Sequence, residues 1–142
     1  MQANTLGLVA ALVAFLSIWA GHVAVRKIEA ASPRLWPPML AFISAGVGLL
    51  AFTTVLKSIH WQAGLGVLGV TLIWDAFELR RQHHRVARGH APANPANPRH
   101  QAMLIAPNSQ ATVADLLARE PIGRPVRDAA EALALVSGKG GH

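Results

Sequence analysis

Three long apolar stretches, separated by short polar segments, occupy most of the first half of the chain. They cover about residues 6–25, 38–56 and 61–79. A helix rises about 1.5 Å per residue, so each stretch is long enough to cross a hydrocarbon layer of about 30 Å. The first two contain no charged residue, and the third reaches its first acidic residue, Asp75, only near its end. The pattern predicts an all-α membrane protein with three transmembrane helices in residues 1–90.

Basic residues are distributed unevenly around these stretches. The second connection contains only Lys57, whereas eight basic residues lie in the first connection or after the third stretch: Arg26, Lys27, Arg34, Arg80, Arg81, Arg85, Arg88 and Arg99. Lys and Arg concentrate on the cytoplasmic side of membrane proteins. The distribution therefore predicts a multi-pass protein with its N terminus outside and its C terminus in the cytoplasm.

The first stretch has an alternative interpretation as a cleaved signal peptide, because small residues occur at Ala20 and Gly21. It lacks the basic segment that opens a signal peptide, and its apolar part is longer than the usual length of about 7 to 15 residues. Without it, two helices would remain with both ends in the cytoplasm, which the charge distribution also allows. Three spans are the expectation, and cleavage is the alternative.

Composition narrows the function classes. The formal net charge is +6 and the sequence pI is about 11.4. The basic excess flanks the apolar stretches, so it indicates contact with anionic lipid headgroups, and we expect no nucleic-acid partner. The chain has no cysteine, which excludes disulfides, thiolate metal sites and a catalytic thiol. No nucleophile with a base, phosphate loop or metalloprotease motif occurs, so we expect no enzyme activity and no cofactor.

Glycines at positions 64, 66 and 69 match the spacing of a dinucleotide-binding loop. That loop requires a preceding strand and opens a helix, whereas this stretch lies inside an apolar helix. We interpret the glycines as packing positions, since small residues allow membrane helices to approach closely. A matching small face on the second stretch is expected to consist of Ala41, Ser44, Ala45 and Gly48.

The C-terminal third is expected to be a cytoplasmic tail. Three prolines make residues 91–99 an extended linker, and residues 100–142 form the tail. Capping and proline signals predict short helices at about residues 113–119 and 126–136. An alternative is that the tail folds only on a partner or stays disordered.

Three ionisable residues lie within the stretches near their expected cytoplasmic ends: His22, Asp75 and Glu78. Groups at membrane depth are functional candidates, and a histidine with carboxylates suits proton relay. The alternative is that they lie in the interface and pair with nearby arginines. The remaining histidines (His60, His83, His84, His90, His100, His142) have irregular spacing, and only His22 lies well inside a span, so neither a metal site nor a haem is expected.

A longer set of residues carries a family resemblance. It includes Gly21-His22, Lys27, Glu29, Trp36-Pro37, Gly66 to Gly69, Trp74, Glu78-Leu79, Gln82, Arg85-Val86, Gly89 and Pro92 to Pro95. Over about residues 5–99 the chain resembles the small bacterial membrane proteins grouped as domain of unknown function 4491. It departs from that pattern at Ala91, where Phe is usual, and in the extra Ala96-Asn97-Pro98.

The resemblance implies a three-span protein of the bacterial inner membrane and supplies no activity. Together with the topology, it leads to the hypothesis of one interlocked polar patch at the cytoplasmic face: His22, Lys27, Glu29, Asp75, Glu78, Gln82 and Arg85. The favoured function is a non-enzymatic accessory or scaffold subunit that contacts lipid headgroups and a protein partner through its tail. The alternative is a small oligomeric ion or proton channel, or a transporter component, which would require a homo-oligomer.

Overall fold

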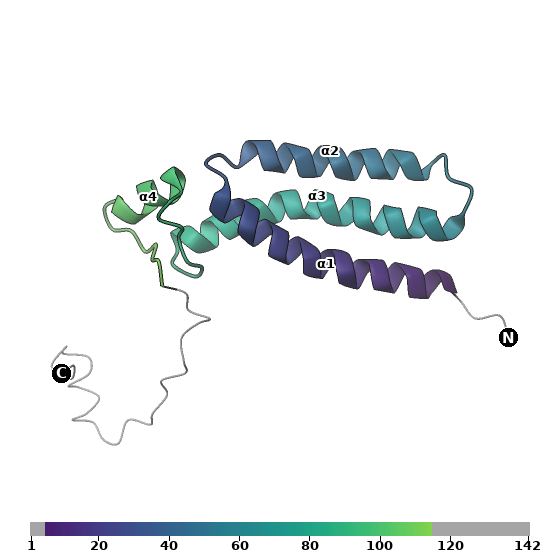
Figure 1. Ribbon diagram of the computed structural model, residues 1–142, viewed down its shortest axis with the longest axis horizontal. Coiled ribbons are helices and arrows are strands. Elements are labelled where there is room, and N and C mark those ends of the chain that lie inside the picture. Colours follow the sequence, from purple (N-terminus) through teal and green to yellow (C-terminus); the bar gives the residue numbers. More distant parts are fainter. Residues whose placement is uncertain (1–4, 115–142) are drawn as a thin grey trace, which may run out of the picture.

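The computed structural model describes residues 5–114, which form four α-helices and no strand (Figure 1). They are α1 (Thr5–Ala31), α2 (Trp36–Thr53), α3 (Ile59–Ala87) and α4 (Pro98–Ile105). The all-α prediction is confirmed for this part of the chain. The three apolar stretches fall within the first three helices, except that α2 ends at Thr53, before the predicted boundary.

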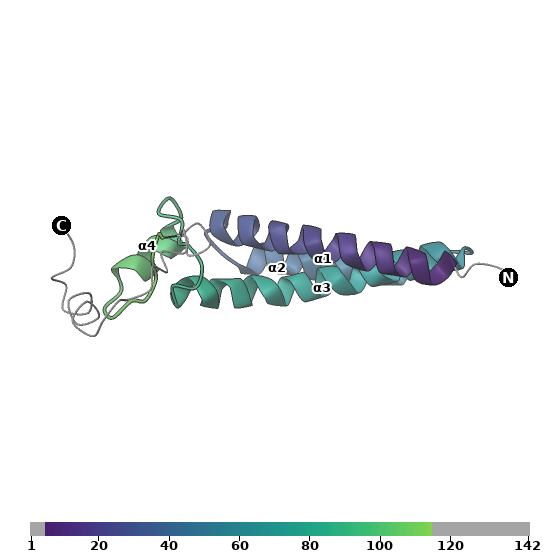
Figure 2. The ribbon, with the colours of Figure 1, turned by 90° about the horizontal axis from the view of Figure 1, so that it is seen from below.

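The three long helices pack side by side, with α3 between α1 and α2 (Figures 1 and 2). The short α4 lies beyond the end of this bundle at which α1 ends and α2 begins. We call this end the capped end, and we call residues 88–114 the cap. The opposite end is the open end, where Thr5 Oγ1 lies 2.8 Å from His60 Nε2 and joins the starts of α1 and α3.

The helix boundaries follow from local chemistry. The first turn of α2 contains Pro37 and Pro38, where missing N–H groups cost little because those donors are unpaired in any helix. The connection from α2 to α3 spans only residues 54–58, so the two helices form the expected antiparallel hairpin. After α3, Gly89 adopts a left-handed φ of 70° and its Cα lies against the carbonyl oxygen of Gln110. A side chain at Gly89 would be strained and would collide with the cap.

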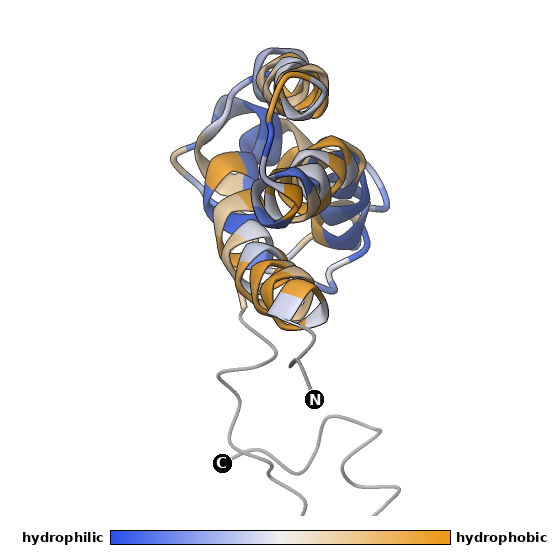
Figure 3. Cartoon of the chain, turned by 90° about the vertical axis from the view of Figure 1, so that its right-hand side faces the viewer, coloured by the Kyte–Doolittle hydropathy of each residue, from blue (hydrophilic) through white to orange (hydrophobic). Residues whose placement is uncertain are grey.

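Two of the helices, α1 and α2, are long and apolar enough to cross a membrane. Their apolar side chains face outward, as shown by Phe15, which is 68% exposed, and by Phe52, which is 52% exposed. Figure 3 shows hydrophobic residues all around the bundle and not only between its helices. The third helix is less apolar because its second half contains Asp75, Glu78 and a run of arginine, glutamine and histidine residues at 80–85. It also has the most buried side chains of the three, since α1 and α2 cover it on two sides.

The contact between α2 and α3 uses small residues, of which Gly69 was among the predicted packing positions and Gly46 was not. A Cβ added to Gly46 would lie 2.6 Å from the carbonyl oxygen of Gly69, so the two backbones meet there. Gly64 instead faces α1, and Gly66 has no neighbouring atom within 4 Å. The small face proposed on the second stretch is wrong: Ala41, Ser44, Ala45 and Gly48 are all exposed. That face of α2 points away from α3 because Gly46 occupies the contact.

The cap begins differently from the predicted linker and tail. Pro98 opens α4, so the extended linker ends at Asn97, and the boundary placed after Arg99 lies inside a helix. The two predicted tail helices lie outside the described residues, except for positions 113 and 114, which are not helical.

Candidate functional site

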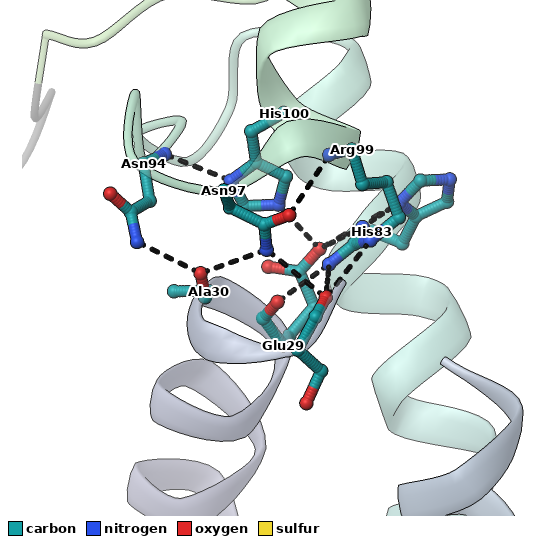
Figure 4. Close-up of polar contacts among 8 residues, drawn as sticks. Glu29, Ala30, His83, Asn94, Asn97, Arg99 and His100 are labelled. Carbon is teal, nitrogen blue, oxygen red and sulfur yellow. Dashed lines mark hydrogen bonds and ion pairs between the residues drawn. The ribbon is translucent and has the colours of Figure 1, made fainter. Parts of the chain in front are cut away.

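The C terminus of α1 is covered by two asparagines of the cap. The last carbonyl groups of any helix lack partners within the helix. Here the Asn94 side-chain amide donates to Ala30 O at 3.0 Å, and the Asn97 amide donates to Ala30 O and Ser32 O, both at 3.0 Å (Figure 4). The cap therefore supplies hydrogen-bond donors for the carbonyl groups at the end of α1, which lies more than 60 residues earlier in the chain.

Each asparagine also organises its own segment. The Asn97 Oδ1 accepts from the Arg99 backbone N–H at 3.0 Å, which makes Asn97 the N-cap of α4, with Pro98 in the first turn. The Asn94 Oδ1 accepts from Ala96 N–H at 3.0 Å and closes a turn. Asn97 is only 3% exposed, so its amide joins α1 and α4 inside a dry contact.

Glu29 lies at the centre of a buried polar network, which we call the Glu29 hub. Its side chain is 1% exposed and its Oε1 lies 2.7 Å from Arg99 Nη1 and 3.0 Å from His100 Nε2. Arg99 Nη2 also donates to the Glu29 backbone carbonyl at 2.5 Å. Figure 4 shows these side chains, which come from α1 and α4, converging with His83 of α3. A buried carboxylate is tolerable only with such partners, because burying an unpaired charge is costly.

The hydrogen bonds of His100 define its tautomer. Its side chain is fully buried, and its Nδ1 accepts from the Asn94 backbone N–H at 2.8 Å. A backbone N–H only donates, so Nδ1 carries no proton and the Nε2–H donates to Glu29. His100 therefore links α4, the linker and α1 as a neutral imidazole.

His83 completes the hub from α3. Its Nδ1 accepts a hydrogen bond from Arg99 Nη1 and lies 3.7 Å from Glu29 Oε1. Burial lowers the pKa of the His83 imidazole below its usual value of 6.5, and the Arg99 charge lowers it further; the Glu29 carboxylate opposes both effects. The neighbouring His84 acts in the same direction as Arg99. The hub is therefore built around a neutral His83.

Acidification should loosen the cap. The pKa of His83 is lower in the folded hub than when the cap is detached from α3. The detached state therefore binds the proton more readily below pH 6.5. The stability of the hub is fully present above pH 6.5 and is lost as the pH falls towards the folded-state pKa of His83. We expect faster amide hydrogen exchange in the cap at about pH 5.5 than at about pH 7.5, after correction for intrinsic exchange rates. His83→Gln should reduce this dependence, and an unchanged dependence in that variant would contradict the assignment.

A second group of charges lies on α3. Glu78 is 5% exposed in its side chain, with Oε1 2.8 Å from Arg85 Nη2 and Oε2 3.5 Å from Arg81 Nε. The Arg85 contact is an ion pair without hydrogen-bond geometry, so Oε1 has no hydrogen-bond donor among the described residues. Arg85 Nη1 donates to Gln82 Oε1 at 3.2 Å. Glu78, Gln82 and Arg85 therefore form one cluster, as the helical spacing predicts.

Asp75 lies where α1 and α3 are closest. Its side chain is almost completely buried, at 5% exposure, and it has no hydrogen bond or ion pair among the described residues. Its carboxylate rests on Gly21: a Cβ there would lie 2.6 Å from Asp75 Oδ2. His22 lines one groove with Asp75 and a second cleft with Glu78. His22, Asp75 and Glu78 therefore lie in the same region between α1 and α3.

Gly21→Ala should separate α1 from α3, because the new methyl group would occupy the position of the Asp75 carboxylate. We expect a loss of about 1 to 3 kcal/mol in the free energy of unfolding, despite the gain of about 1 kcal/mol that alanine gives in a helix. The measurement is denaturant unfolding of the full chain in detergent micelles. Adding Asp75→Ala should recover most of the loss, and Gly66→Ala is the control, since Gly66 has open space around it. An equal loss in Gly66→Ala would contradict the assignment.

The predicted patch is only partly a unit. Glu29 belongs to the hub with Arg99 and His100, whereas Lys27 is exposed and makes no ion pair among the described residues. Residues outside the predicted patch supply most of the hub: His83, Asn94, Asn97, Arg99 and His100. The Asn97-Pro98 pair was the available signal for α4, because asparagine followed by proline is a helix N-terminus signature. Within residues 5–114 no group of three or more His, Asp or Glu residues is arranged to hold a metal ion.

The chain is similar to a known protein family. Residues 4–97 match the family described as a domain of unknown function, DUF4491. No curated protein and no solved structure matches the chain. The match spans α1, α2 and α3 and ends at Asn97, just before Arg99 and His100 of the hub. It covers about two thirds of the sequence, and the resemblance seen in the residues is confirmed: the chain belongs to the DUF4491 family.

Proposed function

We propose that this protein is a three-span protein of the bacterial inner membrane that acts as a non-enzymatic accessory or scaffold subunit. The observation that carries the proposal is the Glu29 hub, which fixes the cap rigidly on the end of the helical bundle. The cap is held by a buried network in which the side chains of Asn97, Glu29 and His100 are hydrogen-bonded. Such a network suits a structural platform better than a catalytic site.

The three-span part of the proposal rests on length and on the neighbours of α3. At about 1.5 Å per residue, α2 is about 27 Å long and α3 is about 43 Å long. The central helix lies antiparallel to α2 and between two helices whose apolar side chains face outward. Because α3 lies between α1 and α2, it crosses the membrane together with them in this proposal. Its few polar residues are accommodated because Asp75 and Glu78 face the bundle and not the surroundings.

In this proposal the hub lies outside the hydrocarbon layer, and the length of α1 supports this position. Glu29 follows Thr5 by 24 residues, which corresponds to about 36 Å, more than the hydrocarbon thickness of about 30 Å. Trp19 and Trp74 are exposed on α1 and α3 below the hub, as expected of residues at a membrane–water interface. With the basic residues at the same end, the cap lies on the cytoplasmic side in this proposal.

The chain leaves the described cap at Ala114, and residues 115–142 follow it. In this proposal the cap directs that segment to a protein partner. The test is crosslinking and co-purification from native membranes with the full chain and with a chain that ends after Ala114. A cut after Arg99 is unsuitable because it removes His100 from the hub. A stoichiometric partner that requires residues 115–142 supports the proposal, and self-crosslinks alone overturn it.

A second candidate function, a small ion or proton channel, is favoured by Asp75. This residue is 5% exposed, has no hydrogen bond among the described residues and lies near His22 and Glu78, so it could carry a proton between α1 and α3. A bundle of three helices is thin for such a path, which would require several copies. Proton flux into liposomes containing the protein, compared with Asp75→Asn, tests this candidate. A flux equal to that of empty liposomes removes it.

A further inference from the structure

Two adjoining clefts open at the capped end beside the Glu29 hub. The larger has a volume of about 360 Å³, and the residues of it that matter here are His22, Arg26, Glu78, Arg85 and His90. The second, of about 300 Å³, is lined by Arg81, His84, Arg85, Arg88 and His90. Arg85 and His90 belong to both, so the two clefts form one continuous site between α1, α3 and the start of the cap.

The charges around this site are unbalanced. Arg26, Arg81, Arg85 and Arg88 face a single carboxylate, that of Glu78. That carboxylate already lies against Arg85 and Arg81, at 2.8 Å and 3.5 Å. Arg26 and Arg88 have no ion pair among the described residues. The site therefore has a net positive charge, and Arg85 is held in place by Glu78 and Gln82.

An apolar groove of about 360 Å³ continues from the larger cleft along α1 and α3. His22 lines both, and the groove runs past Ile18, Val70 and Trp74 towards the middle of the bundle. Thr71 and Asp75 also line it, and Asp75 is only 5% exposed, so most of the groove surface is apolar. Trp74 is 56% exposed, so the groove opens to the surroundings of the bundle. A positive cleft at the end of an apolar groove matches a molecule with an anionic head and a hydrocarbon chain.

We propose that this site binds one anionic phospholipid, with its phosphate between Arg26, Arg85 and Arg88 and an acyl chain along the groove past Trp74. Arginine suits this ligand because its guanidinium forms paired hydrogen bonds with phosphate oxygens. The inference rests on the proposed function, since it requires that the capped end lie at a membrane surface. It goes further by naming a lipid, a stoichiometry and the residues that hold the headgroup.

The test is native mass spectrometry of the full chain, purified in detergent and titrated with phosphatidylglycerol, with phosphatidylcholine and with inorganic phosphate. Arg26→Gln combined with Arg88→Gln is the site variant, because neither residue has an ion pair within residues 5–114. Arg34→Gln combined with Arg80→Gln is the matched control: it removes the same charge from exposed positions outside the clefts. We expect one tightly bound phosphatidylglycerol, with an affinity about 20-fold weaker in the site variant and unchanged in the control.

Each other outcome overturns the proposal in a defined way. Equal losses in both variants would mean that net charge alone attracts the lipid. Binding of inorganic phosphate with the same affinity would show a free-anion site and no role for the groove. Equal binding of phosphatidylcholine would show that the arginines do not select the headgroup. Because membrane fractionation of the same preparations reports insertion separately, loss of the lipid site leaves the accessory function standing, whereas a protein absent from membranes removes both.

Discussion

Glu29→Gln should detach the cap from the bundle and leave the three long helices intact. The carboxylate is 1% exposed and lies 2.7 Å from Arg99 Nη1 and 3.0 Å from His100 Nε2. The substitution keeps the shape of the side chain but removes the charge that balances Arg99. Removing one partner of a buried ion pair costs about 3 to 5 kcal/mol, because the other charge stays buried without compensation. We expect amide exchange in the cap to accelerate by about 100-fold or more.

The measurement is hydrogen exchange of the full chain in detergent micelles. The reporting amides are those of Ala93, which donates to Thr112 O at 2.8 Å, and Asn94, which donates to His100. Lys27→Gln is the control, since Lys27 is on the same helix, is exposed and makes no ion pair among the described residues. Unchanged exchange at Ala93 and Asn94 in Glu29→Gln would contradict the role of the hub.

A double-mutant cycle gives a stricter test. Arg99→Gln alone should produce a similar acceleration, because it leaves the Glu29 carboxylate buried without its main partner. In the Glu29→Gln and Arg99→Gln double variant, two neutral amides face each other, so the effects should be far from additive. Additive effects would mean that the two residues act separately and that the hub is not one unit.

The helical part of the fold followed from the sequence because it depends on local information. Apolar stretches of the length of a helix, a proline pair before the second and a link of five residues before the third determine the order and the hairpin of α2 and α3. What the sequence does not give is which face of each helix meets its neighbour. Gly46 and Gly48 are chemically identical, and only their phase relative to Gly69 decides which one lies in the contact.

The hub was harder to predict, since its members are distant in sequence. Glu29 belongs to the predicted polar patch, but its partners Arg99 and His100 lie about 70 residues later in the chain. Interpreting residues 91–99 as an extended linker does not reveal these two partners, although Asn97-Pro98 is a signal for a helix start. By contrast, Glu78, Gln82 and Arg85 are three or four residues apart on one helix, so spacing alone brought them together.

Among the glycines of the three long helices, Gly46→Ala should cause the largest loss in the free energy of unfolding. A Cβ at this position would lie 2.6 Å from Gly69 O and 2.7 Å from the Ile73 side chain. The oxygen belongs to the α3 backbone, so no rotamer change can relieve the contact and the two helices must separate. Membrane helices depend on such close packing because lipid provides no hydrophobic driving force between them. We expect a loss of about 2 to 3 kcal/mol in the free energy of unfolding in micelles, in spite of the higher helix propensity of alanine.

Gly48→Ala provides a control in the same helix, one half-turn away, where no atom lies within 4 Å. Alanine there gains helix propensity without a clash, so this variant should be as stable as the original chain or more stable by up to about 1 kcal/mol. The two variants have the same composition and differ only in the position of one methyl group. Opposite signs would show that α2 packs on α3 through Gly46, whereas destabilisation by Gly48→Ala would place the contact on the exposed face formed by Ala41, Ala45 and Gly48.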